Sequence, residues 1–203
     1  MSDSIRNSQL SGRYQLGPVV ERGRLGPRFT ATNVQSNQTV IIEVIEQAAF
    51  TEPDDQAVFE REATAMATLE HPGLASLVEV GELGEGASYI VSEAPEGQPL
   101  SQQLELLTPM QPERACSLLL NLLDALAQAH GVGVIHGGVC PDNLIVTRDE
   151  HGSPGLRLTG FAPGLSTQSV PLDDLFLAPE QAAGEAASAQ SDLYSVGLLL
   201  QTL

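Results

Sequence analysis

The hydrophobic pattern of this chain changes its period at one connector, Ala94–Leu100, which reads APEGQPL. Before the connector, apolar or alternating runs at Tyr14–Val20, Thr39–Ile45 and Ser88–Glu93 predict strands. After it the clearest element is Pro112–His130, whose leucines form a wide apolar stripe typical of a helix. The order of these segments predicts an α+β fold with a strand-rich first part and a helical second part.

One helix is also expected within the strand-rich part. In EPDDQAVFEREATAMATLEHPG, the side chains of Phe59, Ala63 and Met66 fall on a single helical stripe. We therefore divide the chain into a flexible tail at residues 1–12, a first lobe at residues 13–93 and a second lobe at residues 94–203.

The charge of the chain limits its partners. The net charge is −17, and all nine basic residues are arginines. Such an acidic chain repels nucleic acid and anionic lipid, so we expect neither as a partner. The N-terminus has no apolar core of a signal peptide, and no apolar run reaches the length of a membrane span. Two isolated cysteines indicate no disulfide framework, so we expect a cytoplasmic protein. One of them, Cys116, lies in an apolar helical run, so we expect it to be a buried thiol.

The stretch VIHGGVCPDN, residues 134–143, lies between two apolar runs. This arrangement predicts a polar loop held by short buried strands, which is where active sites often lie. Yet its centre is Gly137 and Gly138, which carry no side-chain chemistry.

The order and spacing of several motifs over residues 13–203 resemble a eukaryotic-like serine/threonine protein kinase of the bacterial type. The motifs are a glycine-rich turn, IIEV, EREA, HPG, YIVSE, HGGVCPDN, GFA, APE and SDLYSVG. The resemblance implies a two-lobe protein-kinase-like fold with a β-rich N-lobe and a helical C-lobe. It also implies further C-lobe helices after residue 203. We therefore expect a C-lobe truncated after the start of its central helix, in a fragment of a longer protein or beside a partner that covers the exposed faces.

Against the family pattern, Glu43 replaces the lysine that holds the nucleotide phosphates, and Glu62 matches the glutamate that pairs with it. Two acids would then face each other, and the chain has no lysine to substitute. Only an arginine could take this place, and Arg22, Arg24 and Arg28 are the candidates.

The nucleotide pocket is also altered. In the glycine-rich turn Gly23 and Gly26 remain as remnants of a nucleotide site, whereas Glu21 replaces the first glycine. Ile41 replaces a small alanine that packs on adenine, and Pro95 has no N–H to donate to the base. Together with Arg28 at a valine position, these residues predict a blocked pocket.

In the catalytic-loop motif His136 is kept, and Asn143 remains as the last remnant of the metal ligands. Gly138 replaces the catalytic aspartate, and Cys140 replaces a lysine that steadies the transferred phosphate. Gly160 replaces the metal-binding aspartate. The positions that the resemblance assigns to structure are kept: Glu62, Met66, Leu77, His136, Phe161, Glu180 and Asp192.

These losses predict a pseudokinase, a kinase-shaped domain that does not transfer phosphate and acts as a scaffold or allosteric regulator for a protein partner. The partner would be another kinase or its substrate. We expect no cofactor. Two alternatives stay open: a pseudokinase that binds ATP with Mg²⁺ as a structural ligand, and a kinase-fold transferase with unusual catalytic residues. The last would need Glu43, Glu62 or Asp142 as metal ligands in new places.

Overall fold

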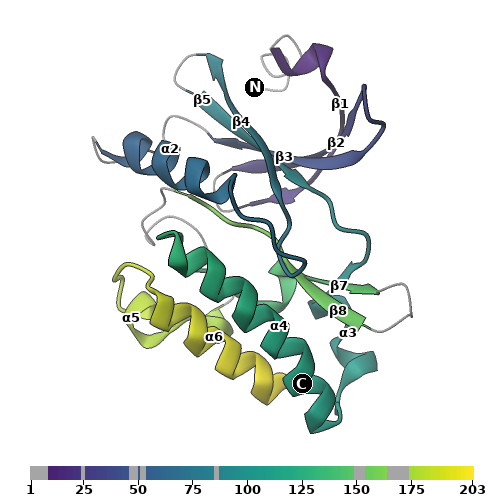
Figure 1. Ribbon diagram of the computed structural model, residues 1–203, viewed down its shortest axis with the longest axis vertical. Coiled ribbons are helices and arrows are strands. Elements are labelled where there is room, and N and C mark those ends of the chain that lie inside the picture. The colour runs from purple at the N-terminus through teal and green to yellow at the C-terminus, as the bar shows by residue number, and fades with distance from the viewer. Residues whose placement is uncertain are drawn as a thin grey trace.

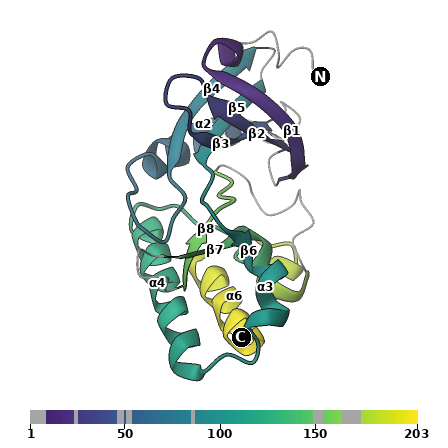
Figure 2. The same ribbon diagram turned by 90° about the vertical axis from the view of Figure 1, so that its right-hand side faces the viewer.

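A computed structural model describes residues 9–23, 26–45, 50, 54–84, 87–148, 154–163 and 174–203. The two lobes expected from the sequence lie one above the other (Figures 1 and 2). A β-sheet with one helix forms the N-terminal lobe, and helices with a small sheet form the C-terminal lobe.

The N-lobe sheet has five antiparallel strands in the order β1-β2-β3-β5-β4. The strands are β1 (Tyr14–Arg22), β2 (Pro27–Asn33), β3 (Thr39–Ile45), β4 (Leu77–Gly84) and β5 (Ala87–Glu93). β3 is central and buried from Ile42 to Ile45, which explains why apolar residues occupy both faces of this strand, with Glu43 as the one charged exception in that stretch. One face of the sheet forms a core around Ile42, Tyr89 and Val91.

Helix α2 (Asp55–Met66) buries the predicted stripe of Phe59, Ala63 and Met66. Phe59 packs in a small core with Ile45 and Ile90 of the sheet. Met66, at the end of the helix, instead belongs to the core of the lower lobe. The helix therefore connects the packing of the two lobes.

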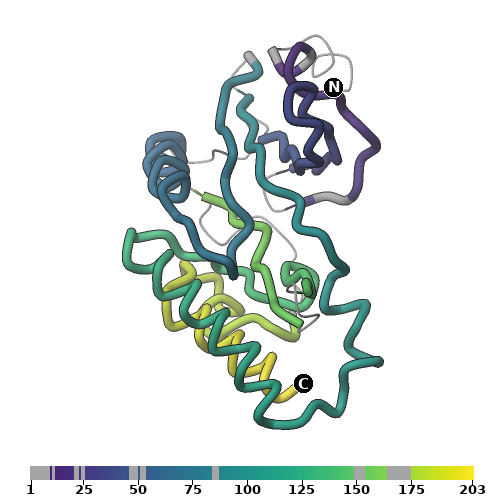
Figure 3. Tube along the Cα trace, turned by 45° about the vertical axis from the view of Figure 1, so that its right-hand side comes forward, coloured from purple at the N-terminus to yellow at the C-terminus, as the bar shows by residue number. Residues whose placement is uncertain are grey.

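The C-lobe is built around α4 (Pro112–Gly131) and α6 (Ala189–Thr202), which pack side by side (Figure 3). Its other helices are α3 (Leu100–Leu107) and α5 (Pro179–Ala182), with 3-10 turns η3 (Pro141–Asn143) and η4 (Asp174–Phe176). A second sheet has the order β6-β7-β8, formed by β6 (Gln98–Pro99), β7 (Leu144–Arg148) and β8 (Pro154–Leu158). The leucine stripe of α4 lies in this core.

Three details differ from the sequence expectation. The tail predicted at residues 1–12 is wrong for its last part, because residues 9–12 form the 3-10 turn η1 (Gln9–Gly12). Leu10 is 1% exposed and packs in the N-lobe core, so apolar burial fixes this turn. The connector contains β6, and α3 begins at its last residue, Leu100. Cys116, in an apolar run of α4, is exposed rather than buried.

Candidate functional site

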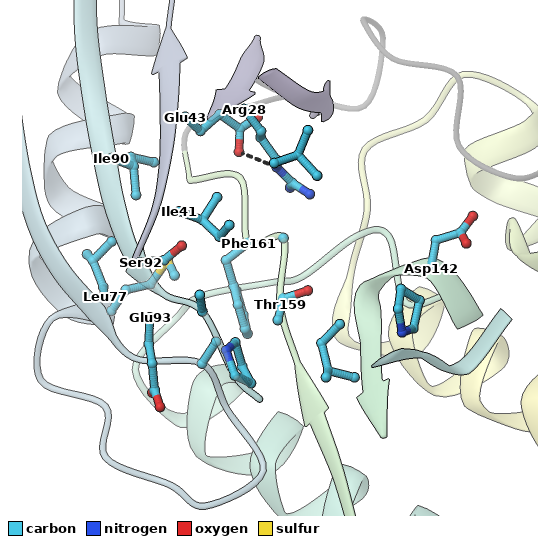
Figure 4. A pocket seen from close by; sticks show the side chains of 18 of the residues that line it. Arg28, Ile41, Glu43, Leu77, Ile90, Ser92, Glu93, Asp142, Thr159 and Phe161 are labelled. Atoms are coloured by element: carbon cyan, nitrogen blue, oxygen red, sulfur yellow. Dashed lines mark hydrogen bonds and ion pairs between the residues drawn. The ribbon is translucent and has the colours of Figure 1, made fainter. Parts of the chain in front are cut away.

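A cavity of about 390 Å³ lies between the lobes (Figure 4). Ile41 and Ile90 line it from the N-lobe, and Phe161 lines it from the C-lobe. Arg28 and Pro95, which were expected to help block a pocket here, line it as well. The prediction of a blocked pocket is therefore wrong, because a cavity remains whose volume is in the range of small-molecule pockets.

One end of the cavity holds a buried ion pair between Arg28 and Glu43. The two residues are 8% and 5% exposed, and Arg28 Nε lies 3.0 Å from Glu43 Oε2. They are directly opposite each other in the β2–β3 pairing, so their side chains share one face of the sheet. The sequence named Arg28 as a candidate cation but expected Glu43 to face Glu62. The Glu62 carboxylate lies 4.0 Å from Arg61 Nη2.

Gly23 and Gly26, on either side of the glycine-rich turn, lie against this ion pair. The backbone N–H of Gly26 donates to Glu43 Oε1 at 3.2 Å. A Cβ on Gly23 would lie 2.3 Å from both Arg28 Nε and Glu43 Oε1, so a side chain there would displace the pair. The two nucleotide-site remnants Gly23 and Gly26 thus contact a carboxylate of the chain itself. Arg24 lies outside the described residues, and the side chain of Arg22 is not described.

The loop at residues 136–143 is held by backbone hydrogen bonds. Asp192, fully buried on α6, accepts from the N–H groups of His136 and Gly137 at 3.0 and 2.7 Å, and its Oδ2 lies 2.8 Å from His130 Nε2. Gly137 has φ of +67°, a conformation that favours glycine. The N–H of Gly138 donates to His136 Nδ1 at 3.1 Å, so His136 Nε2 is the donor to the Thr159 carbonyl at 2.9 Å.

Asn143 and Gly160 face each other at the same end of the cavity. The Asn143 amide donates to the carbonyl of Gly138 at 2.8 Å. A Cβ on Gly160, where φ is +79°, would lie 2.6 Å from Asn143 Oδ1 and 3.0 Å from Arg28 Nη2. The Asn143 oxygen and the Arg28 guanidinium therefore border the small space that a side chain at position 160 would need. Cys140, at the other altered position of the loop, is buried.

Four of the residues that the resemblance assigns to structure, Met66, Leu77, His136 and Phe161, come together between the lobes. Met66 and Phe161 share one core with the partly buried Leu77, and the rings of His136 and Phe161 meet edge to face with centroids 4.6 Å apart. Glu180 accepts a hydrogen bond from the Ser191 hydroxyl at 2.6 Å, which lowers the pKa of its carboxyl.

The residues present do not fit a magnesium triphosphate at this end of the cavity. Glu43 is held against Arg28, so a carboxylate already occupies the guanidinium that could otherwise bind a phosphate. Gly160 offers no carboxylate, although Mg²⁺ prefers carboxylate and phosphate oxygens. Among the described residues, no three His, Cys, Asp or Glu side chains gather into a group that could hold a metal ion.

Sequence reasoning missed a second ion pair, between Glu93 at the end of β5 and Arg157 on β8. Arg157 donates to both Glu93 oxygens, at 2.5 and 2.6 Å, and to the carbonyl of Leu74 at 2.6 Å. This hydrogen bonding to Arg157 is the main reason that the pKa of Glu93 is lowered. The pair joins residues 64 positions apart, and no local sequence signal marks it.

The sequence matches the family described as protein kinase domain over residues 14–203. A probable serine/threonine-protein kinase of Streptomyces coelicolor is 32% identical over 96% of this chain, and the match covers 30% of that protein. The serine/threonine-protein kinase PknA of Mycobacterium tuberculosis is 31% identical over 94% of this chain and 46% of its own length. The chain thus spans less than half the length of these two relatives.

Among solved structures, the PknI kinase domain of Mycobacterium tuberculosis matches with a TM-score of 0.69 at 22% identity. The match covers 92% of this chain and 72% of that domain. At this identity it shows the fold alone, and it confirms the two-lobe architecture predicted from the sequence. In the described part of the chain, no helix combines the length and apolar character needed to cross a membrane.

Proposed function

This chain belongs to the protein kinase domain family, among the bacterial-type serine/threonine kinases, and we propose that it is a member without phosphoryl transfer that acts by binding a protein partner. The observation that carries the proposal is the buried Arg28–Glu43 pair, which stands where the family holds the nucleotide phosphates. A carboxylate at position 43 repels phosphate, and its guanidinium partner is already engaged with it.

Two other positions support the proposal. Gly138 replaces the catalytic aspartate, and Gly160 replaces the metal-binding aspartate. The chain therefore lacks both the side chain that accepts the substrate's proton and the side chain that binds the metal ion. Each such loss lowers the rate of phosphoryl transfer by orders of magnitude. The Asp192 anchor and the His136–Phe161 contact keep the shape of the loop without its chemistry.

Binding of a protein is the function that this retained shape serves best. We propose another kinase or its substrate as the partner, and the cytoplasm as the compartment. The second candidate is a pseudokinase that binds ATP without transfer, which the 390 Å³ cavity favours. A transferase with relocated acids has less support, because Glu43 contacts Arg28 and Asp142 is exposed at the rim of the cavity.

Nucleotide and phosphate assays on the intact protein test the loss of chemistry. We expect no change in thermal unfolding with millimolar ATP, with or without Mg²⁺ or Mn²⁺, and no labelled phosphate on the chain or on added casein. A shift that needs the metal ion would favour the ATP-binding candidate. Incorporation of phosphate would contradict the proposal outright.

The binding role needs a separate measurement. We expect a protein that co-purifies with the intact chain from its own cells to bind the purified chain with the same Kd in the presence and absence of Mg²⁺-ATP. A partner that binds only in the presence of nucleotide would favour the ATP-binding candidate. Recovery of no stable partner would contradict a scaffold role.

A further inference from the structure

We propose that the Arg28–Glu43 pair is a built-in clasp, which occupies the phosphate end of the cleft and holds the two lobes closed with no ligand bound. The two charged side chains of the pair would then take the place that a nucleotide and its metal ion occupy between the lobes. The inference goes beyond the proposed function, because it concerns lobe closure and requires neither a partner nor a nucleotide.

Both charged groups of the clasp have hydrogen-bonding partners within the N-lobe. Arg28 contacts one carboxylate oxygen of Glu43 at 3.0 Å, and the backbone N–H of Gly26 contacts the other at 3.2 Å. A buried ion pair is tolerated when its remaining hydrogen-bonding groups are also satisfied. The register of β2 and β3 fixes the two side chains opposite each other, so the pair does not depend on a ligand to assemble.

Gly23 lies directly against this pair. A Cβ on Gly23 would come within 2.3 Å of Arg28 Nε and Glu43 Oε1. Real Cβ contacts are not this short, so a side chain at position 23 would have to displace the two charged groups. The glycine at this position leaves the internal ion pair undisturbed.

The guanidinium also reaches the C-lobe. Arg28 Nη2 lies 3.0 Å from the position of a Cβ on Gly160, and Asn143 Oδ1 lies 2.6 Å from the same point. The guanidinium of Arg28, on β2, therefore lies beside Gly160 and borders the same small space as the amide oxygen of Asn143. Because Asn143 is itself fixed to Gly138 at 2.8 Å, the clasp ends on an ordered loop.

The position of the clasp in the cleft suits this role. The Glu93–Arg157 pair ties β5 to β8 beside the connector, and Figure 4 shows Glu93 well apart from Arg28 and Glu43 across the cavity. The Glu93–Arg157 pair and the approach of Arg28 to Gly160 join the lobes at two separate places on the cavity wall, which resist a hinge motion better than one. We therefore expect the lobes to keep one relative orientation in the absence of any ligand.

Distances between spin labels on the two lobes test the clasp directly. One label is placed on exposed Cys116 in α4, and the second on Val34→Cys in the exposed turn after β2. For the labelled parent chain we expect one narrow distance distribution that Mg²⁺-ATP does not shift. Arg28→Met is expected to broaden this distribution and lengthen its mean distance. A distribution unchanged by Arg28→Met would overturn the proposal.

Arg13→Met is the matched control, because it removes an arginine that contacts Glu79 at 2.8 Å within the N-lobe alone. We expect it to leave the distance distribution unchanged. Broadening of the same size in this control would mean that any lost ion pair loosens the lobes, and the clasp would be rejected.

Arg28→Met leaves a buried carboxylate without its cation and can unfold the chain, so a double variant keeps the test decisive. Arg28→Met with Glu43→Met replaces both charges by apolar side chains, which buried sites often accept without loss of stability. We expect this variant to fold with a melting temperature close to that of the parent and still show the broadened distribution. A narrow, parent-like distribution in the folded double variant would refute the clasp, whatever the outcome of the phosphate and partner assays.

Discussion

Gly160 stands where the family carries a metal-binding aspartate, and its surroundings now suit a residue without a side chain. Its φ is +79°, and both Arg28 Nη2 and Asn143 Oδ1 border the position of its missing Cβ. The sequence identifies the loss of the aspartate at this position. It does not reveal that the vacated space borders an arginine from another lobe, because that proximity depends on tertiary packing.

Restoring the aspartate alone should therefore not restore metal binding. We expect Gly160→Asp to show no thermal shift with Mg²⁺-ATP, since the carboxylate would have to displace Asn143 and Arg28. Gly160→Ala combines the strain of a positive φ with the close approach of its Cβ to Asn143, and should lower the free energy of unfolding by about 1–3 kcal/mol. Gly197→Ala, in the open on α6 with ordinary φ, should instead raise it by about 0.5–1 kcal/mol. A metal-dependent shift in Gly160→Asp would contradict this prediction.

The side chain of Tyr89 has a raised pKa that can be measured. Its hydroxyl donates to Glu79 at 2.8 Å, and burial together with this hydrogen bond raises its pKa to about 12. The phenol therefore stabilises the fold at pH values below the ordinary tyrosine range, and this contribution is lost as the pH rises through the folded pKa.

An absorbance titration of phenolate measures this shift among the three tyrosines. We expect Tyr89 to ionise last, and Glu79→Gln to lower its pKa only in part, because the carboxylate no longer opposes the phenolate while burial, the larger cause, remains. The transition that disappears in Tyr89→Phe is the ionisation of Tyr89. Ionisation of all three tyrosines together near pH 10 would show that the contact does not form in solution.

At the scale of elements, the sequence predicted what each segment forms but not every surface that it presents. The alternation and apolar runs of β3 and the leucine stripe of α4 marked a strand and a helix. Within α4, however, Ala115 is buried and its neighbour Cys116 is exposed. Successive helical residues are about 100° apart around the axis, so only the packed neighbours decide which of two apolar positions faces the core.

The Glu93–Arg157 pair between β5 and β8 predicts a loss of stability in acid. The pKa of Glu93 is lowered, so its contribution is present at neutral pH and is lost as the pH falls below the ordinary glutamate range through the folded pKa. We expect Glu93→Gln to be less stable to urea than the parent at pH 7, and the difference to shrink in acid. The effect will be small, because the Glu93 side chain is 38% exposed.

Glu96→Gln is the control for this prediction, since Glu96 is an exposed acid on the same connector. It should leave urea stability unchanged at both pH values. If Glu93→Gln and Glu96→Gln behave alike across the titration, the ion pair with Arg157 adds nothing to the fold.

Across the whole molecule, the lobes share apolar packing as well as charged contacts. Met66 belongs to α2 of the N-lobe, yet it is 6% exposed within the cluster that holds α4, β8 and Phe161. Leu74 pairs with Leu158 of β8 and is buried in the same core. We therefore expect the two lobes to unfold together.

Met66→Ala tests this coupling. We expect it to lower the free energy of unfolding by about 2–5 kcal/mol, because a buried methionine leaves a cavity. Hydrogen exchange in urea should show β3 and α4 opening at the same midpoint in the parent chain. Val78→Ala, at an exposed position of β4, should change stability little. Separate midpoints in the parent would contradict the shared core.

The sequence alone was enough to identify the order of strands and helices, the division near residue 94, the glutamate in place of a lysine at position 43, and the missing aspartates at positions 138 and 160. These follow from local periodicity and from which side chain stands at each place in a motif. Only the tertiary structure decided that Arg28 lies on Glu43, that Gly23 lies against the pair and that the guanidinium reaches Gly160. Such contacts depend on strand register and on the approach of two lobes, which bring together residues that are distant in the chain.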